Sequence, residues 1–408
     1  MKILHVNYFD IFGGAAKAAY RLHKALISAG INSQMLVQEK YYDDEEVIGP
    51  NFFEKYYGKI RFHYDRIKLR KFNSDLVSFY SPSGSPFSYI PHKIKKINPD
   101  IVHLHWFQGN MMRIEDLLKI NKPLIWTVHD MWAITGGCFC SLGCTNYKNS
   151  CGKCYLLNSN KRNDLSFKLY KRKINVYNNR NITMASPSKW LFKELKGMNI
   201  FNRVVNIPNI INFENFTPYS IKEDAKRYYQ IPQRKKCILF VSMNIKDKNK
   251  GFNLLEKALE KIEEEIIVMI VGDGEVKLKE MKGLQFKRIG FIKNEEELNN
   301  LYNAADITVV PSIQENFSNV IIESMLSGTP VVAFNVGGNP DLIEHKINGY
   351  LAEPYSISDL SLGIKWLLFS ENLQKISALG REDILKKFNK QKILSEYINL
   401  YKSVLKKT

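Results

Sequence analysis

The chain has 408 residues, of which 45% are hydrophobic and 25% are charged. This is the composition of a globular protein, and the length allows two or three domains with large cores. No apolar run reaches the roughly 18 residues of a membrane-spanning helix, which excludes a protein built from such helices. The first residues, MKILHVNYFD, lack the apolar core and small-residue cleavage site of a signal peptide, so we expect a cytoplasmic location.

The net charge of +18 is unevenly distributed along the chain. Residues 1–210 contain 31 Lys and Arg against 15 Asp and Glu, whereas the remainder contains 28 against 26. A basic half indicates a polyanionic partner, such as nucleic acid, anionic lipid or a phosphorylated acceptor. No nucleic-acid-binding motif is present, so we expect lipid or phosphate and no nucleic acid. A bias toward lysine codons would give the same composition without any such partner.

The N-terminal stretch predicts a strand, a glycine turn and a helix. The strand covers residues 2–8, the turn contains Gly13 and Gly14, and an alanine-rich helix covers residues 15–29. A helix N-terminus after a glycine turn is suited to binding an anion. The spacing is not that of the dinucleotide-binding motif G-x-G-x-x-G, and a plain tight turn would also explain it.

A basic, aromatic helix is predicted between residues 52 and 72. Apolar side chains recur there at spacings of three and four, and basic residues fill much of the rest. The apolar members are Phe53, Tyr56, Tyr57, Ile60, Tyr64 and Ile67, and the basic members are Lys55, Lys59, Arg61, Arg66, Lys68, Arg70 and Lys71. Such a helix can lie on an anionic membrane surface. It can equally cover a core with its apolar side and expose its lysines to water.

Further strands alternate with helical stretches, which predicts a doubly wound parallel sheet. In such sheets, ligands bind beyond the carboxyl ends of the strands. His105 and His129 follow the strands predicted at 101–104 and 123–128. Two histidines in such positions favour a functional role, and Asp130 is placed to orient the ring of His129.

Five of the six cysteines lie within 17 residues, namely Cys138, Cys140, Cys144, Cys151 and Cys154. In a cytosolic protein, clustered cysteines indicate metal or redox chemistry rather than structural disulfides. Four of them, Cys138, Cys144, Cys151 and Cys154, could form a structural zinc site. Disulfides and free thiols remain as alternatives.

The second half repeats the strand and helix alternation of the first half after residues 209–218, which we interpret as a linker. Strands are predicted at 237–242, 266–271, 287–291, 307–311 and 331–334, and helices at 359–369 and 392–405 close the chain. Gly272 and Gly274 lack the third glycine of a nicotinamide-binding motif.

The segment QENFSNVIIESMLSGTP carries two acids eight positions apart, Glu315 and Glu323. Glu315 is predicted in a loop, and Glu323 in a helix that begins near Ser318. A helix N-terminus suits a phosphate, and carboxylates accept hydrogen bonds from sugar hydroxyls. The segment therefore predicts a cradle for a sugar phosphate, although two solvated helix ends would also carry such acids.

With these motifs the chain resembles the family 4 glycosyltransferases of the GT-B type, within the group that serves bacterial capsule, exopolysaccharide or lipopolysaccharide synthesis. The most specific motif is E-x7-E at Glu315 to Glu323. Supporting motifs are Gly13-Gly14, W-T-V-H-D at 126–130, I-P-N at 207–209, K-G at 250–251, V-G-D-G at 271–274 and N-V-G-G at 335–338. The cysteine segment resembles an insertion of that group.

The resemblance implies an α/β fold of two doubly wound parallel-sheet (Rossmann-like) domains that face each other across a cleft. The expected N-terminal domain, on the acceptor side, covers residues 1–208 with the cysteine insertion at about 136–156. The linker at 209–218 leads to a nucleotide-sugar-binding domain at 219–385, and the helix at 386–408 packs back toward the N-terminal domain.

The resemblance also implies roles for single residues. Glu315 meets the hydroxyls of the donor sugar, Glu323 holds the ribose, and His129 lies near the reacting carbon. Lys250 faces the diphosphate. Further donor contacts are expected from Gly13, Gly14, Gly272, Phe291, Ile292 and the backbone amides of Asn316, Phe317 and Ser318.

One position departs from the family pattern. Asn244 stands where the family usually carries an arginine that binds phosphate, and Lys246 is our choice for the second phosphate-binding cation. An ammonium neutralises phosphate charge but does not form the forked pair of a guanidinium.

The resulting prediction is a retaining, hexosyltransferase-type enzyme with His129, Glu315 and Lys250 as catalytic residues. It would move a sugar from a UDP- or GDP-sugar to a glycan or lipid-linked acceptor in surface polysaccharide synthesis. Because no D-x-D motif is present, we expect no metal or other cofactor in catalysis. A nucleotide-sugar epimerase and a non-catalytic carbohydrate- or membrane-binding subunit are the alternatives. Peripheral attachment to the inner face of the plasma membrane is an option.

Overall fold

The structure is a computed structural model that describes residues 1–72, 74–85, 87–220, 222–278 and 280–406; the side chains of Lys68, Asp75 and Val77 lie outside this description. The chain forms two compact units. Unit 1 comprises Met1–Ile211 and Lys390–Thr408, and unit 2 comprises Asn212–Asn389. No helix among the described residues is both long and apolar enough to cross a membrane.

Unit 1 contains a seven-stranded parallel sheet in the order β3-β2-β1-β4-β5-β6-β7. The strands are β1 (Lys2–Phe9), β2 (Asn32–Glu39), β3 (Val47–Ile48), β4 (Ile101–Leu104), β5 (Leu124–Thr127), β6 (Ile182–Ser186) and β7 (Arg203–Asn206). The chain moves outward from β1 to β3 and then returns to place β4 on the other side of β1. The strand order therefore reverses between β1 and β4, which is where doubly wound sheets bind ligands.

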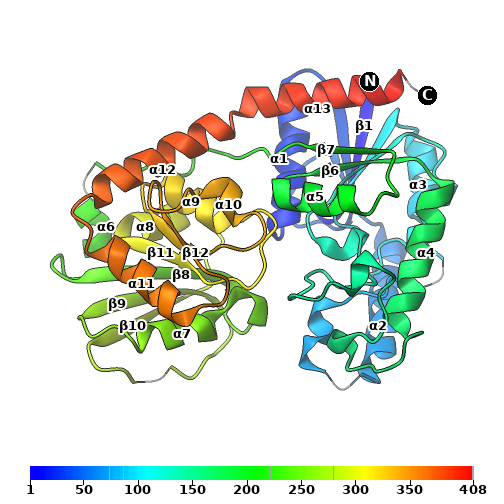
Figure 1. Cartoon of the computed structure of the whole chain (residues 1–408). Coiled ribbons are helices and arrows are strands. Elements are labelled where there is room, and N and C mark those ends of the chain that lie inside the picture. Colours follow the sequence, from blue (N-terminus) through cyan, green and yellow to red (C-terminus); the bar gives the residue numbers. More distant parts are fainter. Residues whose placement is uncertain (73, 86, 221, 279, 407–408) are drawn as a thin grey trace. The chain divides into compact units, whose positions relative to one another are not determined.

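Six helices belong to unit 1 among the described residues. They are α1 (Gly14–Ser28), α2 (Phe52–Arg70), α3 (Ile90–Ile97), α4 (Leu165–Asn179), α5 (Lys189–Gly197) and α13 (Lys390–Leu405). Helix α1 buries an alanine-rich stripe that also contains Leu22, His23 and Leu26. Helix α13 (red in Figure 1) joins unit 1 late in the chain. Its Tyr397 and Tyr401 are buried, and the Tyr401 hydroxyl lies 2.8 Å from His103 Nδ1 on β4.

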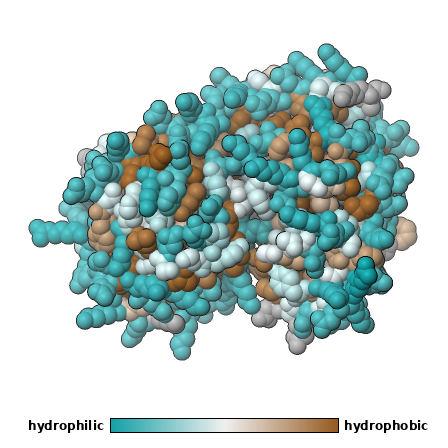
Figure 2. Space-filling view, in the orientation of Figure 1, coloured by the Kyte–Doolittle hydropathy of each residue, from teal (hydrophilic) through white to brown (hydrophobic). Residues whose placement is uncertain are grey.

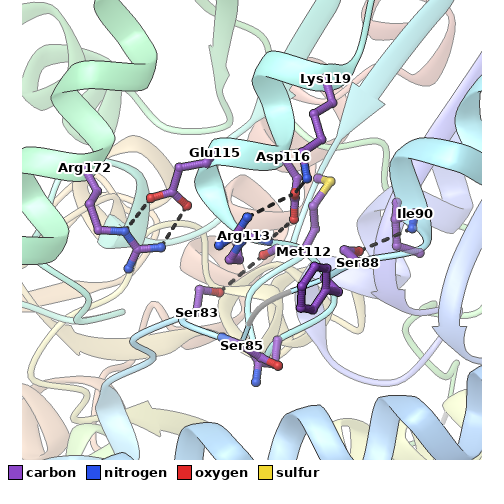
Figure 3. Close-up of polar contacts among 12 residues, drawn as sticks. Ser83, Ser85, Ser88, Ile90, Met112, Arg113, Glu115, Asp116, Lys119 and Arg172 are labelled. Carbon is purple, nitrogen blue, oxygen red and sulfur yellow. Dashed lines mark hydrogen bonds and ion pairs between the residues drawn. The ribbon is translucent and has the colours of Figure 1, made fainter.

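Short 3-10 helices connect the outer elements of unit 1: η1 (Asp75–Phe79), η2 (Ile114–Lys119), η3 (Met131–Ala133), η4 (Asn146–Lys148) and η5 (Tyr155–Leu157). Figure 3 shows how polar contacts fix η2. Arg172 on α4 donates two hydrogen bonds to Glu115, at 2.5 and 2.8 Å, and this forked geometry is the strong form of such a pair. Lys119 lies 2.7 Å from the buried carboxylate of Asp116.

Unit 2 contains a six-stranded parallel sheet in the order β10-β9-β8-β11-β12-β13. The strands are β8 (Lys236–Asn244), β9 (Ile266–Asp273), β10 (Leu284–Gly290), β11 (Ile307–Val310), β12 (Val331–Phe334) and β13 (Tyr350–Ala352). The helices are α6 (Lys222–Tyr228), α7 (Phe252–Leu259), α8 (Glu295–Ala304), α9 (Asn319–Leu326), α10 (Asn339–Leu342), α11 (Ile357–Leu368) and α12 (Leu373–Lys387), with η6 at Lys248–Lys250. Here the strand order reverses between β8 and β11.

The inner strands β4, β5, β11 and β12 are buried along their whole length on both faces, as is usual in parallel sheets. The cores lie between sheet and helices, and they include Trp126 and Trp132 in unit 1 and Phe240 and Phe334 in unit 2. On the face shown in Figure 2, hydrophilic side chains predominate and hydrophobic ones appear in scattered groups.

The predicted fold class of two Rossmann-like parallel-sheet domains is confirmed. Some elements differ from the prediction. The strand predicted at 287–291 lies at Leu284–Gly290, so Phe291 follows it. The edge strands β3 and β13 were not predicted, because two-residue and three-residue strands show too little alternation to recognise. Helix α12 was not predicted either.

Candidate functional site

The reversal point of the unit 2 sheet brings two loops together. The η6 turn follows β8 and carries Lys250, and the loop after β11 carries Glu315. Lys250 Nζ lies 2.6 Å from Glu315 Oε1, and these side chains are 31% and 12% exposed. The side chain of Asn249 donates to the Gln314 carbonyl at 2.9 Å and accepts from the Gln314 amide at 3.0 Å. The ion pair therefore sits on two loops that are locked to each other.

Two glycines allow the close approach of these loops. Gly251 has φ +70°, and a β-carbon there would strike the carbonyl of Pro311. Gly337, in the loop after β12, has φ +55°, and a β-carbon there would strike the carbonyl of Glu315. The neighbouring Gly338 amide donates to that same carbonyl at 2.9 Å. The glycine of K-G thus lies against the start of the Glu315 loop at Pro311, and the glycines of N-V-G-G lie against the Glu315 carbonyl itself.

Helix α9 carries the second acid of the E-x7-E motif. Ser318 is its N-cap and accepts a hydrogen bond from the Ile321 amide at 3.5 Å. Glu323 is 5% exposed, and the Tyr302 hydroxyl donates to its Oε2 at 3.2 Å. Burial holds the pKa of Tyr302 well above its usual value, so this hydroxyl stays protonated as a donor.

The other predicted donor-binding residues of unit 2 also lie at the carboxyl ends of its strands. Asn244 ends β8, and its side-chain oxygen accepts from the Lys246 amide at 2.9 Å, which closes the turn beneath the exposed Lys246. Gly272 lies in β9, while Phe291 and Ile292 follow β10 and are half-buried. Asn316 and Phe317 stand between Glu315 and the α9 cap, and the Phe317 ring packs edge-on against Phe388.

The remaining predicted residues, Gly13, Gly14 and His129, belong to unit 1. Gly13 has φ +91° and is the N-cap of α1, which begins at Gly14 after β1. His129 follows β5, and its Nε2 lies 3.1 Å from Nδ1 of the buried His105 after β4. The Nε2 of His105 in turn lies 3.0 Å from Nδ1 of His5 on β1. The three imidazole rings therefore form a hydrogen-bonded row that runs from the carboxyl ends of the strands into the interior of unit 1.

The role predicted for Asp130 is wrong. Its carboxylate accepts hydrogen bonds from Trp106 Nε1 at 2.9 Å and from the Trp132 amide at 2.8 Å. Within the described part of the chain, the recorded partner of the His129 ring is His105, so His105 orients that ring. Burial raises the pKa of Asp130 to about 6.

Sequence reasoning missed His5 and His103 as members of this cluster. The alternation in His103-Leu104-His105 places both histidines on one face of β4, but only the pairing of β4 with β1 brings His5 beside them. Burial lowers the pKa of His103 to about 3 and that of His129 to about 4, and it also lowers the pKa values of His5 and His105 well below the usual value. The rings are therefore neutral at physiological pH.

The four cysteines predicted as zinc ligands line one cavity in unit 1. Cys138, Cys144, Cys151 and Cys154 are free thiols, and the cavity volume is about 20 Å³. Burial raises the pKa of Cys138 and Cys151 to about 12.

The comparison with protein families matches both units. The description Glycosyltransferase Family 4 matches residues 12–215, and Glycosyl transferases group 1 matches residues 221–381. An uncharacterized glycosyltransferase of Methanocaldococcus jannaschii is 30% identical over 54% of this chain and 59% of its own length. The putative colanic acid biosynthesis glycosyl transferase WcaC of Escherichia coli is 22% identical over 99% of this chain and 100% of its own length.

The fold is similar to that of a solved structure, Anabaena HepE in complex with UDP and glucose. The TM-score is 0.67 at 15% identity, over 99% of this chain and 100% of HepE. The resemblance stated from the motifs is confirmed: the chain belongs to glycosyltransferase family 4 and has the GT-B fold of two Rossmann-like domains.

Proposed function

We propose that the chain is a retaining hexosyltransferase of bacterial surface polysaccharide synthesis. It takes a sugar from a UDP- or GDP-sugar and transfers it to a glycan or lipid-linked acceptor. The observation that carries this proposal is the Lys250–Glu315 pair at the reversal point of the unit 2 sheet, 2.6 Å apart on two interlocked loops.

The chemistry of the pair fits such a donor. In the transfer, the bond between the anomeric carbon and the diphosphate oxygen breaks, and the nucleoside diphosphate leaves with the electron pair. The acceptor hydroxyl forms the new bond, and its proton leaves with the diphosphate. A cation at the diphosphate stabilises the developing charge, typically by about 3–4 kcal/mol for one well-placed donor. Lys250 supplies that cation, and Glu315 accepts hydrogen bonds from the sugar hydroxyls.

Before the donor binds, each member of the pair neutralises the other, which avoids an unpaired charge in a half-buried position. The relatives support this assignment: HepE was solved with UDP and glucose, and WcaC is named for colanic acid biosynthesis. The sequence has no D-x-D motif, so we assign charge neutralisation to Lys250, Lys246 and the N-terminus of α9 rather than to a metal ion.

Thermal-shift measurements with UDP, GDP, CMP, ADP and dTDP, each with and without EDTA, test the donor site. One diphosphate should raise Tm with no effect of EDTA, and Lys250→Ala and Glu323→Gln should abolish the shift. Lys248→Ala, two positions away, is the matched control and should retain it. If no diphosphate stabilises the wild type, a non-catalytic subunit is favoured. Turnover of donor without acceptor would identify an epimerase, and NMR of the product gives the anomeric configuration.

We also propose that helix α2 attaches the protein to an anionic membrane surface, because its amphipathicity is inverted. The apolar stripe points to solvent: Phe53 is 80% exposed, Tyr56 66%, Ile60 51% and Ile67 51%. The opposite face, which packs on the rest of unit 1, contains the buried and polar Arg61 and Asp65 together with one buried apolar residue, Leu69.

Both polar side chains of the inner face make hydrogen bonds within unit 1. Arg61 Nε donates to the Asn110 carbonyl at 2.8 Å, and Asp65 accepts from the Gly84 amide at 3.0 Å. The exposed Lys55, Lys59 and Arg66 accompany the apolar stripe, a combination suited to anionic headgroups. The exposed apolar stripe favours this attachment over the alternative in which the apolar side of the helix covers a core.

Co-sedimentation with vesicles tests the attachment. Wild type should bind phosphatidylglycerol vesicles at low salt and bind phosphatidylcholine vesicles weakly. The variant Phe53→Ser/Tyr56→Ser/Ile60→Ser should lose binding, whereas Leu362→Ser, which removes an apolar side chain that is 57% exposed in unit 2, should keep it. Equal binding by all variants would refute the assignment to α2.

A further inference from the structure

We propose that Cys138, Cys144, Cys151 and Cys154 bind one Zn²⁺ that holds the segment between η3 and α4 in its fold. The four side chains line a single cavity of about 20 Å³, which has room for about one water-sized particle. The described lining of this cavity does not include Cys140, although it lies on the same segment. Four thiolates around one small cavity match the ligand set of a structural zinc site.

A backbone amide points at one of the sulfurs. The Gly136 amide donates to Cys151 Sγ at 3.1 Å. A neutral thiol is a weak acceptor and gains little from such a donor. A metal-bound thiolate carries charge that this donor stabilises, and such outer contacts orient the ligands of metal sites.

A buried lysine stands beside the cavity. Lys173 on α4 is 1% exposed, its Nζ donates to the carbonyls of Trp132 and Thr135, and it lies 3.4 Å from the centre of the Trp132 ring. Burial holds the pKa of Lys173 well below its usual value, which disfavours the charged form of its side chain. Zinc bound by four thiolates carries a net charge of −2, so the complex would supply the counter-charge that this lysine needs in its buried position.

The backbone of this segment contains strained conformations whose energetic cost other interactions must offset. Cys151 has φ +57° and Lys153 has φ +47°, and both are left-handed conformations that cost energy for residues other than glycine. Between η3 and α4, the described residues form the three-residue turns η4 and η5 and an isolated bridge of Cys138 to Tyr80. Metal binding can supply folding free energy to a segment with so little secondary structure.

The sulfurs must move inward when the ion binds. Among the described residues, only His5, His103 and His105 offer three ligand atoms within 4.8 Å of one another. Zinc would set the sulfurs about 3.8 Å apart, given Zn–S bonds of about 2.3 Å in a tetrahedron. The proposal therefore includes a contraction of the turns around the cavity, with release of the four thiol protons to solvent.

Metal analysis of the full chain, purified under reducing conditions without chelator, tests the site. We expect about one zinc per chain in the wild type, in Cys140→Ser and in Cys237→Ser, and less than one-fifth of that in Cys151→Ser and Cys154→Ser. Wild type with only traces of zinc, or loss of zinc in Cys140→Ser equal to that in Cys151→Ser, would overturn the proposal.

Because the ligand variants can misfold, cobalt substitution of the wild type is the second measurement. The spectrum should be that of tetrahedral cobalt with four thiolates, and any other ligand set would refute the assignment.

The linked imidazole rings of His5, His105 and His129 support a second, independent inference. These rings are not a metal site, because five of the six ring nitrogens of His5, His103 and His105 already have hydrogen-bond partners. Three lone pairs therefore cannot converge on one ion. We infer instead that His105 and His5 are positioning residues that set the tautomer of His129. This inference rests on the proposed function only in giving His129 a role at the donor sugar.

The number of protons on the three rings fixes the direction in which they donate. Each neutral imidazole carries one N–H, and two hydrogen bonds join the three rings in a row, so all three must donate in the same direction. If they donated inward, His5 Nε2 would carry a buried N–H without a partner. Orphaned buried N–H groups are rarer than unused acceptors. The chain therefore donates outward, which places the proton of His129 on Nδ1, where it can be donated to a ligand.

Selective ¹⁵N labelling of histidine reports each tautomer by NMR without any need for turnover. We expect His129 to carry its proton on Nδ1 in the wild type and in His345→Gln, and to show a mixture of tautomers in His5→Leu and in His105→Leu. A wild-type proton on Nε2, or a tautomer of His129 unchanged in both variants, would refute the inference.

Kinetics provide the second measurement. His105→Leu should lower kcat on the order of tenfold with little change in KM for the donor, and His105→Asn, whose amide can still donate, should restore most of it. Equal losses in both variants would indicate a packing role only. If the wild type shows the expected tautomer but no transfer, the proposed function fails and this inference stands.

Discussion

At the scale of single residues, the site depends on side chains whose partners are distant in the sequence. Lys250 and Glu315 are 65 positions apart, and the K-G and E-x7-E motifs identified both without showing that they form one ion pair. That pairing follows from the strand order, in which β8 and β11 are neighbours although two strands intervene in the chain. Glu323 was predicted on a helix, and the structure adds that Tyr302 on α8 is its partner.

The Tyr302–Glu323 contact predicts a loss of stability in Tyr302→Phe. The substitution leaves a buried carboxylate oxygen without that donor, which typically costs about 1–3 kcal/mol. Urea denaturation monitored by circular dichroism measures the loss. Tyr355→Phe is the control, since its hydroxyl bonds the Ile313 carbonyl at an exposed position in the same unit and should cost much less. Equal losses would show that the buried acid does not depend on Tyr302.

At the scale of elements, the parallel sheets could be predicted because their central strands are apolar runs bounded by turn residues. The inverted helix α2 could not be assigned, since its spacing fits both a membrane-facing and a core-facing stripe. Which side is buried depends on partners such as Asn110 and Gly84 that meet Arg61 and Asp65 only in the folded unit. The role of Asp130 was wrong for a similar reason, because the two tryptophans that bind it come from β4 and η3 segments.

The left-handed glycine between η6 and α7 predicts a sensitive position. Gly251→Ala should destabilise unit 2 by about 1–3 kcal/mol and weaken diphosphate binding, since the new methyl group meets the Pro311 carbonyl at φ +70°. Calorimetry and the diphosphate thermal shift measure both effects. Gly197→Ala has open space around its β-carbon and should be nearly neutral. Unchanged diphosphate binding in Gly251→Ala would show that the loop tolerates displacement.

At the scale of the whole molecule, the buried histidines are confined to one unit. His5, His23, His103 and His105 are buried in unit 1, whereas His345 of unit 2 is exposed. Folding lowers the pKa values of the four buried rings and of His129, so the unfolded chain binds more protons below about pH 6.5. Their contribution to stability is complete above that pH and falls as the pH drops toward the folded pKa values.

We therefore predict that unit 1 unfolds at a higher pH than unit 2 on acidification. Each buried histidine removes about 1.4 kcal/mol per pH unit below about pH 6.5, and the raised pKa of Asp130 opposes this only in part, between about pH 4 and 6. Four of the five tryptophans lie in unit 1, so fluorescence of Trp366→Phe reports that unit alone. Coincident acid transitions of this fluorescence and of the helical signal of unit 2 would contradict the prediction.

The membership of α13 in unit 1 has a consequence for the order of events during synthesis. Unit 2 is inserted into unit 1, and residues 390–405 supply the buried Tyr397 and Tyr401 that cover His103. The seven-stranded sheet is translated early but remains uncovered on this side while the inserted unit is made. At roughly 5–20 residues per second, translation of residues 212–389 leaves an interval of roughly ten to forty seconds. During that interval the nascent first unit lacks the cover of α13, and we expect chaperones at the ribosome to bind the side that is left exposed.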